Sequence, residues 1–235
     1  MRLPVRAVTY RRILVGTDGS DSADRALVHA SWLARAVQAE LIICHSYRTA
    51  DPVQEQAMAA TVLRDACARS EISAPKPVLR EGNAADALID VAREEAADLI
   101  VVGNRGLGGR RALMGTVTAR VAGGAPCDVL IANTSRPGGE PGWARVLIGT
   151  DRSPTANRAA EAGTALAGAV GAESEVLEVT DREPALGLVE AAANRSADLI
   201  VIGNRGVVGA RRFLTSVPSR VARRAPCHVL LVKTT

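Results

Sequence analysis

The sequence predicts an α/β protein of two tandem domains, each built on a parallel sheet, with the second domain truncated. Short apolar runs alternate with helical patterns, and residues 97–132 recur at 197–232 with 20 of 36 positions identical. Aromatic residues make up only 2% of the chain, so its cores must be aliphatic. Such alternation is typical of parallel sheets with crossover helices, and aliphatic side chains suit their buried strands.

The repeat also predicts where the two domains lie. The first domain occupies residues 1–135, and a Pro- and Gly-rich linker follows at 136–142. The second, shortened copy occupies 143–235. It restarts with RVLIGTD at 145–151, which matches RILVGTD at 12–18.

The expected elements of the first domain follow a loose leader at residues 1–10. Apolar runs predict strands at 11–17, 41–45, 76–80, 97–102 and 128–132. Helical spacing of apolar residues predicts helices at 23–38, 54–69, 84–96 and 116–123. The strands and helices therefore alternate through the whole domain.

The second copy is shorter because part of its middle is missing. Its first strand is offset by 133 residues from the first copy, but its glycine-rich loop is offset by only 100, so 33 residues are missing between them. One strand and one helix are lost, equivalent to the second or third strand and the helix between. Such a small core is marginal, so we expect this half to pack against the first as an internal pseudo-dimer, with strand 128–132 beside 228–232. A homodimer of whole chains is left open.

A glycine-rich stretch follows the fourth strand of the first domain. It reads GNRGLGGRRALMGTV over residues 103–117. Glycines allow positive φ and bring backbone N–H groups close to a ligand, and the helix starting near Thr116 directs its dipole at an anion. The stretch therefore predicts a phosphate site, although a connector that binds nothing is the alternative. It has no Gly-Lys-Ser/Thr and is not a Walker-type loop.

A second candidate segment ends the first strand at Gly16, Thr17 and Asp18. Ligands of open parallel sheets bind beyond the carboxyl ends of the strands, so this turn and the glycine-rich loop are expected to face one crevice. Asp18 either hydrogen-bonds a ribose or helps to cap the next helix with Ser20 and Ser22.

Charge and composition narrow the class of protein. The net charge is +4, and almost all of the positive charge is carried by arginines. These arginines are spread along the chain, which does not favour a nucleic-acid partner. No apolar run approaches membrane-spanning length and no secretory leader is visible, so we expect a cytoplasmic protein without a membrane partner. The four cysteines are then expected to be reduced packing thiols.

Catalytic signals are weak. The three histidines show no metal spacing, and only His45, at a strand end near the expected crevice, is of interest. No pair of carboxylates or activated nucleophile stands out. We therefore predict no enzyme, or at most a slow ATPase.

Four motifs in order carry a resemblance to a known family. They are VGTDGS at the first strand, GNRG after the fourth, a Gly-Thr-Val helix start, and APCDVLI at the fifth. Together they resemble the universal stress protein family, and the two copies resemble its tandem type. The resemblance implies Rossmann-like, adenine nucleotide-binding domains and a role in survival under stress. Many members bind ATP through a Gly-x2-Gly-x9-Gly-Ser/Thr loop, others lack it, and members commonly dimerise through the last strand.

The resemblance places ATP, with or without Mg²⁺, in the first domain. The residues that it assigns to the nucleotide are Gly16, Thr17, Asp18, Ser46, Gly103, Asn104, Arg105, Gly106, Gly115, Thr116 and Val117. A nucleotide-dependent regulatory module is then the expected function.

The sequence departs from the family's loop in both copies. Only eight residues separate Gly106 from Gly115, and in the second copy Thr215 replaces the third glycine while Arg152 replaces the glycine after Asp151. These departures favour the first copy as the nucleotide site and the second as a degenerate structural copy. They also leave open an interaction protein that binds no nucleotide.

Overall fold

The computed structural model describes residues 10–48, 52–104, 115–134, 141–179, 183–204 and 215–234. The first half contains β1 (Arg12–Thr17), α1 (Asp21–Val37), β2 (Glu40–Tyr47), α2 (Pro52–Arg69), β3 (Lys76–Glu81), α3 (Ala84–Glu94), β4 (Leu99–Gly103), α4 (Thr116–Gly124) and β5 (Asp128–Ala132). The second half contains β6 (Arg145–Thr150), α5 (Pro154–Val170), β7 (Glu173–Glu178), α6 (Pro184–Asn194), β8 (Leu199–Asn204), α8 (Val217–Arg224) and β9 (His228–Lys233). Residues 1–9 of the predicted leader and most of the predicted linker at 136–142 lie outside the described residues, whereas Tyr10, which the sequence assigns to the loose leader, is buried in the core.

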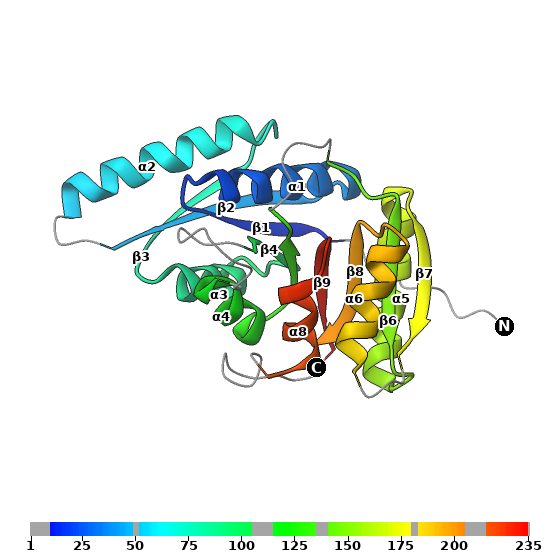
Figure 1. Cartoon of the computed structure of the whole chain (residues 1–235). Coiled ribbons are helices and arrows are strands. Elements are labelled where there is room, and N and C mark those ends of the chain that lie inside the picture. Colours follow the sequence, from blue (N-terminus) through cyan, green and yellow to red (C-terminus); the bar gives the residue numbers. More distant parts are fainter. Residues whose placement is uncertain are drawn as a thin grey trace.

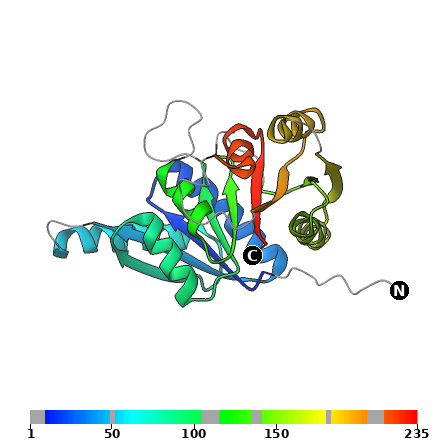
Figure 2. The same cartoon turned by 90° about the horizontal axis from the view of Figure 1, so that it is seen from below.

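One sheet of nine strands runs through both halves, in the order β3-β2-β1-β4-β5-β9-β8-β6-β7 (Figure 1). Within each half the strand pairs are parallel, as the sequence predicts. The two predicted sheets are thus joined edge to edge into a single sheet. Seen from below, the red β9 lies beside the green strands of the first half (Figure 2).

Two apolar cores cover the two faces of this sheet, and each core extends across both halves. One contains residues of α3, α4, α6 and α8, and the other contains residues of α1, α2 and α5. Alternate residues of a strand enter opposite cores, so that Val129 and Ile131 of β5 enter the first and Leu130 enters the second. The aliphatic cores expected from the composition are therefore shared between the halves.

The halves meet at β5 and β9, which pair antiparallel. The register places Val129 opposite Leu231 and Leu130 opposite Leu230. The predicted contact between strands 128–132 and 228–232 is confirmed. Because β5 would otherwise be the edge of the first sheet, this pairing closes one exposed edge of each half.

Two side chains at equivalent positions of the two copies stabilise the junction, because each accepts a hydrogen bond from a backbone N–H group of the other half. Asp128 Oδ1 accepts from the Lys233 N–H at 2.7 Å, and His228 Nδ1 accepts from the Asn133 N–H at 3.1 Å. The Tyr10 hydroxyl donates to Asp128 Oδ2 at 2.9 Å. Burial raises the pKa of Asp128 to about 6 despite these donors. The junction therefore holds a carboxylate at a cost in desolvation.

Aromatic side chains from both halves pack beside this junction. Trp32 of α1 meets Trp143, just before β6, with ring centroids 4.9 Å apart. His29 of α1 meets His228 of β9 at 4.2 Å in an edge-to-face arrangement. Both tryptophans of the chain thus serve the contact between the halves.

The structure identifies the elements that the second half lacks. β7 pairs with β6 as β2 pairs with β1, so that Leu177 takes the place of Cys44 opposite the strand's glycine. The missing elements are therefore the equivalents of β3 and α2, which decides between the two alternatives left by the sequence. β7 becomes an edge strand, and its Val176 is 51% exposed.

We predict that the fragment 143–235 does not fold stably by itself. Its four strands would have open edges at both β7 and β9, and its share of each core would be exposed where the first half packs. Circular dichroism with urea titration of the fragment, compared with the full chain, measures this. A monomeric fragment that unfolds cooperatively with a stability near that of the full chain would contradict the prediction.

We predict that the stability of Asp128→Asn relative to wild type increases as the pH rises. A raised folded-state pKa means that the contribution of Asp128 to stability is present below its unfolded pKa near 3.8 and is lost as the pH rises through about 6. The variant has no carboxyl group to lose this contribution. The free energy of unfolding of the variant minus that of wild type should therefore increase by up to about 3 kcal/mol between pH 4 and pH 7. Urea titrations of both proteins at several pH values measure the difference, in which the titration of all other groups cancels. A difference independent of pH would refute it.

Candidate functional site

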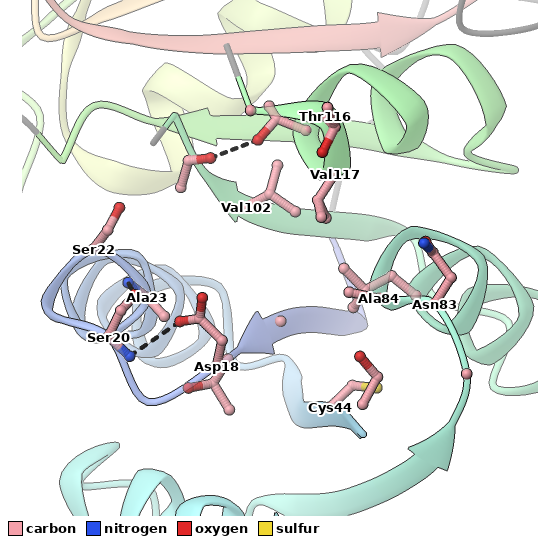
Figure 3. A pocket seen from close by; sticks show the side chains of 18 of the residues that line it. Asp18, Ser20, Ser22, Ala23, Cys44, Asn83, Ala84, Val102, Thr116 and Val117 are labelled. Atoms are coloured by element: carbon pink, nitrogen blue, oxygen red, sulfur yellow. Dashed lines mark hydrogen bonds between the residues drawn. The ribbon is translucent and has the colours of Figure 1, made fainter. Parts of the chain in front are cut away.

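A cavity of about 550 Å³ opens at the carboxyl ends of the first-half strands (Figure 3). Its walls come from the ends of β1, β2 and β4, the turn into α3, and the first turn of α4. The chain leaves β1 for β2 on one side, whereas β4 lies on the other, so the cavity sits where the strand order reverses. This is the position at which open parallel sheets bind their ligands.

The first turn of α4 forms one wall of the cavity. Gly115 occupies the N-cap position and provides no side-chain cap, so no N-cap side chain occupies the amides of the first helical turn, a position that suits an anion. The Thr118 hydroxyl donates to the carbonyl of Gly103 at 2.8 Å and so fixes this turn to the end of β4. Thr116 and Val117 line the cavity beside it. The arrangement can hold a phosphate group without a cationic side chain.

The end of β1 forms another wall, on which Asp18 lies across the cavity from Thr116 (Figure 3). Asp18 Oδ1 accepts from the Ser20 N–H at 3.0 Å, which closes a short turn. Ser20 itself caps α1 by accepting from Ala23 N–H at 3.2 Å. Capping therefore belongs to Ser20, and Asp18 presents a carboxylate to the cavity.

Two cavity glycines lie in close contact with side chains of the neighbouring helices. A Cβ on Gly16 would lie 2.9 Å from Leu88 Cδ1, and a Cβ on Gly103 would lie 3.0 Å from Ser22 Oγ. Both distances are shorter than a normal contact, so a Cβ at Gly16 would push the Leu88 side chain aside, and one at Gly103 would press on the Ser22 side chain and on its carbonyl oxygen at 3.3 Å. These glycines thus shape the cavity as well as lining it.

The remaining wall comes from the ends of β2 and β3. It includes Cys44, Arg48 and Asn83, and Asn83 also caps α3 by accepting from Ala85 N–H at 3.0 Å. Burial raises the pKa of the Cys44 thiol to about 12, so the thiol stays protonated and is a poor nucleophile. All four cysteines are free thiols, as the sequence predicts.

The structure brings most of the predicted site residues together in this cavity. Those that line it are Gly16, Thr17, Asp18, Ser46, Gly103, Gly115, Thr116 and Val117. Asn104 does not line it, because its Oδ1 accepts from Thr134 N–H at 3.0 Å and from the Thr134 hydroxyl at 2.8 Å. Arg105 and Gly106, and with them the shortened loop spacing, lie outside the described residues.

Several lining residues were not predicted. Arg48 follows β2, Gly82 and Asn83 follow β3, and Leu88 lies on α3. The rule that ligands lie beyond strand carboxyl ends would have found the first three, because each comes within about three residues of the end of a predicted strand. Leu88 carries no such signal, since its place depends on how α3 packs over Gly16.

His45 has a structural role beside the cavity. Its Nδ1 donates to the carbonyl of Thr17 at 2.7 Å, which ties the end of β2 to the end of β1. It is not among the lining residues. The histidine therefore helps to hold the β1 turn in place.

A smaller cavity of about 390 Å³ occupies the equivalent position in the second half. One N–H group at the start of α8 already has a partner, since Ser216 caps this helix by accepting from Ser219 N–H at 3.3 Å. Pro218 replaces Thr118 and removes one amide from that first turn. An anion would find fewer free donors here than at α4.

The wall of this second cavity has also changed. Val179 stands where Ser46 lines the first cavity, and within the described part of the second half no strand equivalent to β3 completes the wall. Arg152 forms an ion pair with Glu178 at the end of β7. These changes favour a structural rather than a nucleotide-binding role for this half.

Neither a metal centre nor a membrane-spanning segment is found among the described residues. They contain no group of three His, Cys, Asp or Glu placed to hold a metal ion. Within the same ranges, no helix combines the length and the apolar character needed to cross a bilayer.

Comparison with known proteins gives consistent relatives. The model of the universal stress protein family matches residues 9–133 and 171–233. Universal stress protein Rv1636 of Mycobacterium tuberculosis is 40% identical over 146 residues, which cover 54% of this chain and 98% of that protein. A universal stress protein of Thermus aquaticus is 37% identical over 134 residues, which cover 52% of this chain and 98% of that protein.

A solved structure shares the arrangement of the whole chain. The crystal structure of a universal stress protein from Archaeoglobus fulgidus has a TM-score of 0.77 at 19% identity, covering 95% of this chain and 96% of that one. At this identity the likeness shows the fold alone. With one segment of the family model matched in each half, the chain belongs to the universal stress protein family as a tandem, two-copy member.

Proposed function

We propose that the first half binds ATP in the 550 Å³ cavity and that the chain acts as a nucleotide-dependent regulatory module of the stress response. The observation that carries the proposal is the uncapped start of α4 facing the Asp18 carboxylate across one cavity. A volume of this size is typical of small-molecule sites, which range from about 300 to 1,000 Å³.

Each wall suits a different part of the nucleotide. The amides at Thr116 and Val117 suit phosphate oxygens, because the helix dipole and free N–H groups both favour an anion. The Asp18 carboxylate suits the hydroxyl groups of a ribose. The apolar wall at Leu88 and the Ser46 side chain suit a purine ring. Mg²⁺, where it accompanies ATP, would be carried mainly by the phosphates.

The proposal assigns binding rather than fast turnover. The ionisable side chains that line the cavity within the described residues are Asp18, Cys44 and Arg48. Asp18 already accepts a hydrogen bond in its turn, and burial keeps the pKa of the Cys44 thiol at about 12. A general base positioned at the phosphate end would have to come from elsewhere.

The alternative is an interaction protein of the same fold that binds no nucleotide. The eight-residue spacing between Gly106 and Gly115 motivates it, because a missing residue shifts the chain by up to about 3.5 Å. Direct measurement of binding separates the two.

We predict that the wild-type chain binds a single ATP and that Gly115→Glu abolishes this binding. The new carboxylate would occupy the free amides of α4 and repel phosphate. Isothermal titration calorimetry measures affinity and stoichiometry. The matched control is Thr215→Glu, which places the same charge at the equivalent position before α8 and should leave binding unchanged. If wild type does not bind millimolar ATP, the alternative of an interaction protein without nucleotide is supported. Binding of two ATP per chain would show that the second half also binds.

We predict that Asp18→Ala weakens ATP binding by about tenfold, the size expected for losing one hydrogen bond to a charged group. The same titration, with ATP and with inorganic triphosphate, separates this effect from the phosphate contacts. The variant should bind triphosphate as wild type does. An equal loss for both ligands would contradict a contact with the ribose and would show that the substitution acts through the turn that Asp18 closes.

A further inference from the structure

The carboxyl end of α4 is held by two donors from the second half. Asn204 Nδ2 donates to the carbonyl of Ala122 at 2.9 Å, and Lys233 Nζ donates to the carbonyl of Ala125 at 2.9 Å. Ala122 belongs to the last turns of α4, and Ala125 is its C-cap residue. Carbonyls at a helix end need partners outside the helix, and a cation there also favours the helix dipole.

Asn204 makes this contact in place of one within its own half. Its equivalent, Asn104, accepts from the Thr134 hydroxyl with Oδ1 at 2.8 Å. In the second half both Asn204 Oδ1 and Thr234 Oγ1 are buried without a hydrogen-bond partner among the described residues. The two unsatisfied atoms carry an energetic cost, and the Asn204 amide donates to α4 of the other half instead of pairing with Thr234 in its own half.

The other end of the same helix lines the candidate nucleotide site. α4 is only nine residues long, so its two ends lie about 13 Å apart along a rigid rod. Its first turn is fixed to β4 through Thr118, and its last turn is fixed to the second half through Asn204 and Lys233. A shift of the second half would therefore move the amides that face the cavity.

We propose that the second half regulates nucleotide binding in the first by positioning α4, with Asn204 and Lys233 as the positioning residues. This inference rests on the proposed function, because it concerns the nucleotide affinity of the same cavity. Coupling between sites is reciprocal, so a bound nucleotide must also strengthen the hold of the second half on α4. The degenerate copy is then a regulatory part of the site.

The test uses the full-length chain with Asn204→Ala, Lys233→Met and the double variant. Calorimetry with ATP should show a loss of affinity of up to about tenfold for each single variant and a larger loss for both, because the free energy of one hydrogen bond sets the upper limit of its coupling to binding. Lys233→Arg keeps a cationic donor and should restore most of the affinity. The matched controls are Lys76→Met, which changes the only other lysine, and Asn194→Ala at the end of α6, and both should bind as wild type does.

A second measurement separates positioning from a general loss of stability. Hydrogen exchange of the β5 and β9 amides should slow on adding ATP to wild type and should not slow in the double variant. Urea titration establishes that each variant is folded under the conditions of binding.

The outcomes distinguish this inference from the proposed function. Wild type that does not bind ATP defeats the proposed function and this inference with it. Wild type that binds, with variants that bind equally well and show the same exchange response, overturns the inference alone. An equal loss of affinity in Lys76→Met, or no recovery in Lys233→Arg, also overturns it.

Discussion

The antiparallel pairing of β5 with β9 is the interaction on which the rest of the molecule depends. It joins five strands of the first half to four of the second, and both apolar cores cross the sheet at this point. Val129 and Leu231 belong to one core while Leu130 and Leu230 belong to the other, so one strand pair serves both faces. Neither half closes its core alone, which explains why a half without β3 and α2 equivalents can persist in the chain.

Because the described part of the second half lacks an equivalent of β3, β7 is left as the edge strand of the sheet. β7 has a free edge, and three of its six residues are glutamates, at 173, 175 and 178. Charged side chains on an edge strand discourage pairing with other chains. Two of these glutamates also form ion pairs with arginines of the same half, Glu175 with Arg195 and Glu178 with Arg152. Acidic residues thus protect the edge that the missing strand would have covered.

Most of the fold and of the site could be predicted because the relevant signals are local in sequence. Apolar runs locate the strands, and residues directly after them, such as Asp18 and Ser46, fall at one edge of a parallel sheet. Asn104 shows where this reasoning stops, because its partner Thr134 is 30 residues away and turns its side chain from the cavity. The contact of Asn204 with Ala122 lies 82 residues away in the chain, and no periodicity indicates it.

The two copies of the last helix show how duplication allows one of them to specialise. At the start of α8, Ser216 accepts from the Ser219 N–H group, and Pro218 has no N–H group to donate. Both features stabilise the helix start but leave fewer donors for an anion. α4 begins at Gly115, so no N-cap side chain occupies those donors, but the helix start is weaker for it. A short helix with an open start needs support at its other end, and Asn204 and Lys233 of the second half supply that support. The self-capped copy thereby stabilises the half whose helix start lines the larger cavity.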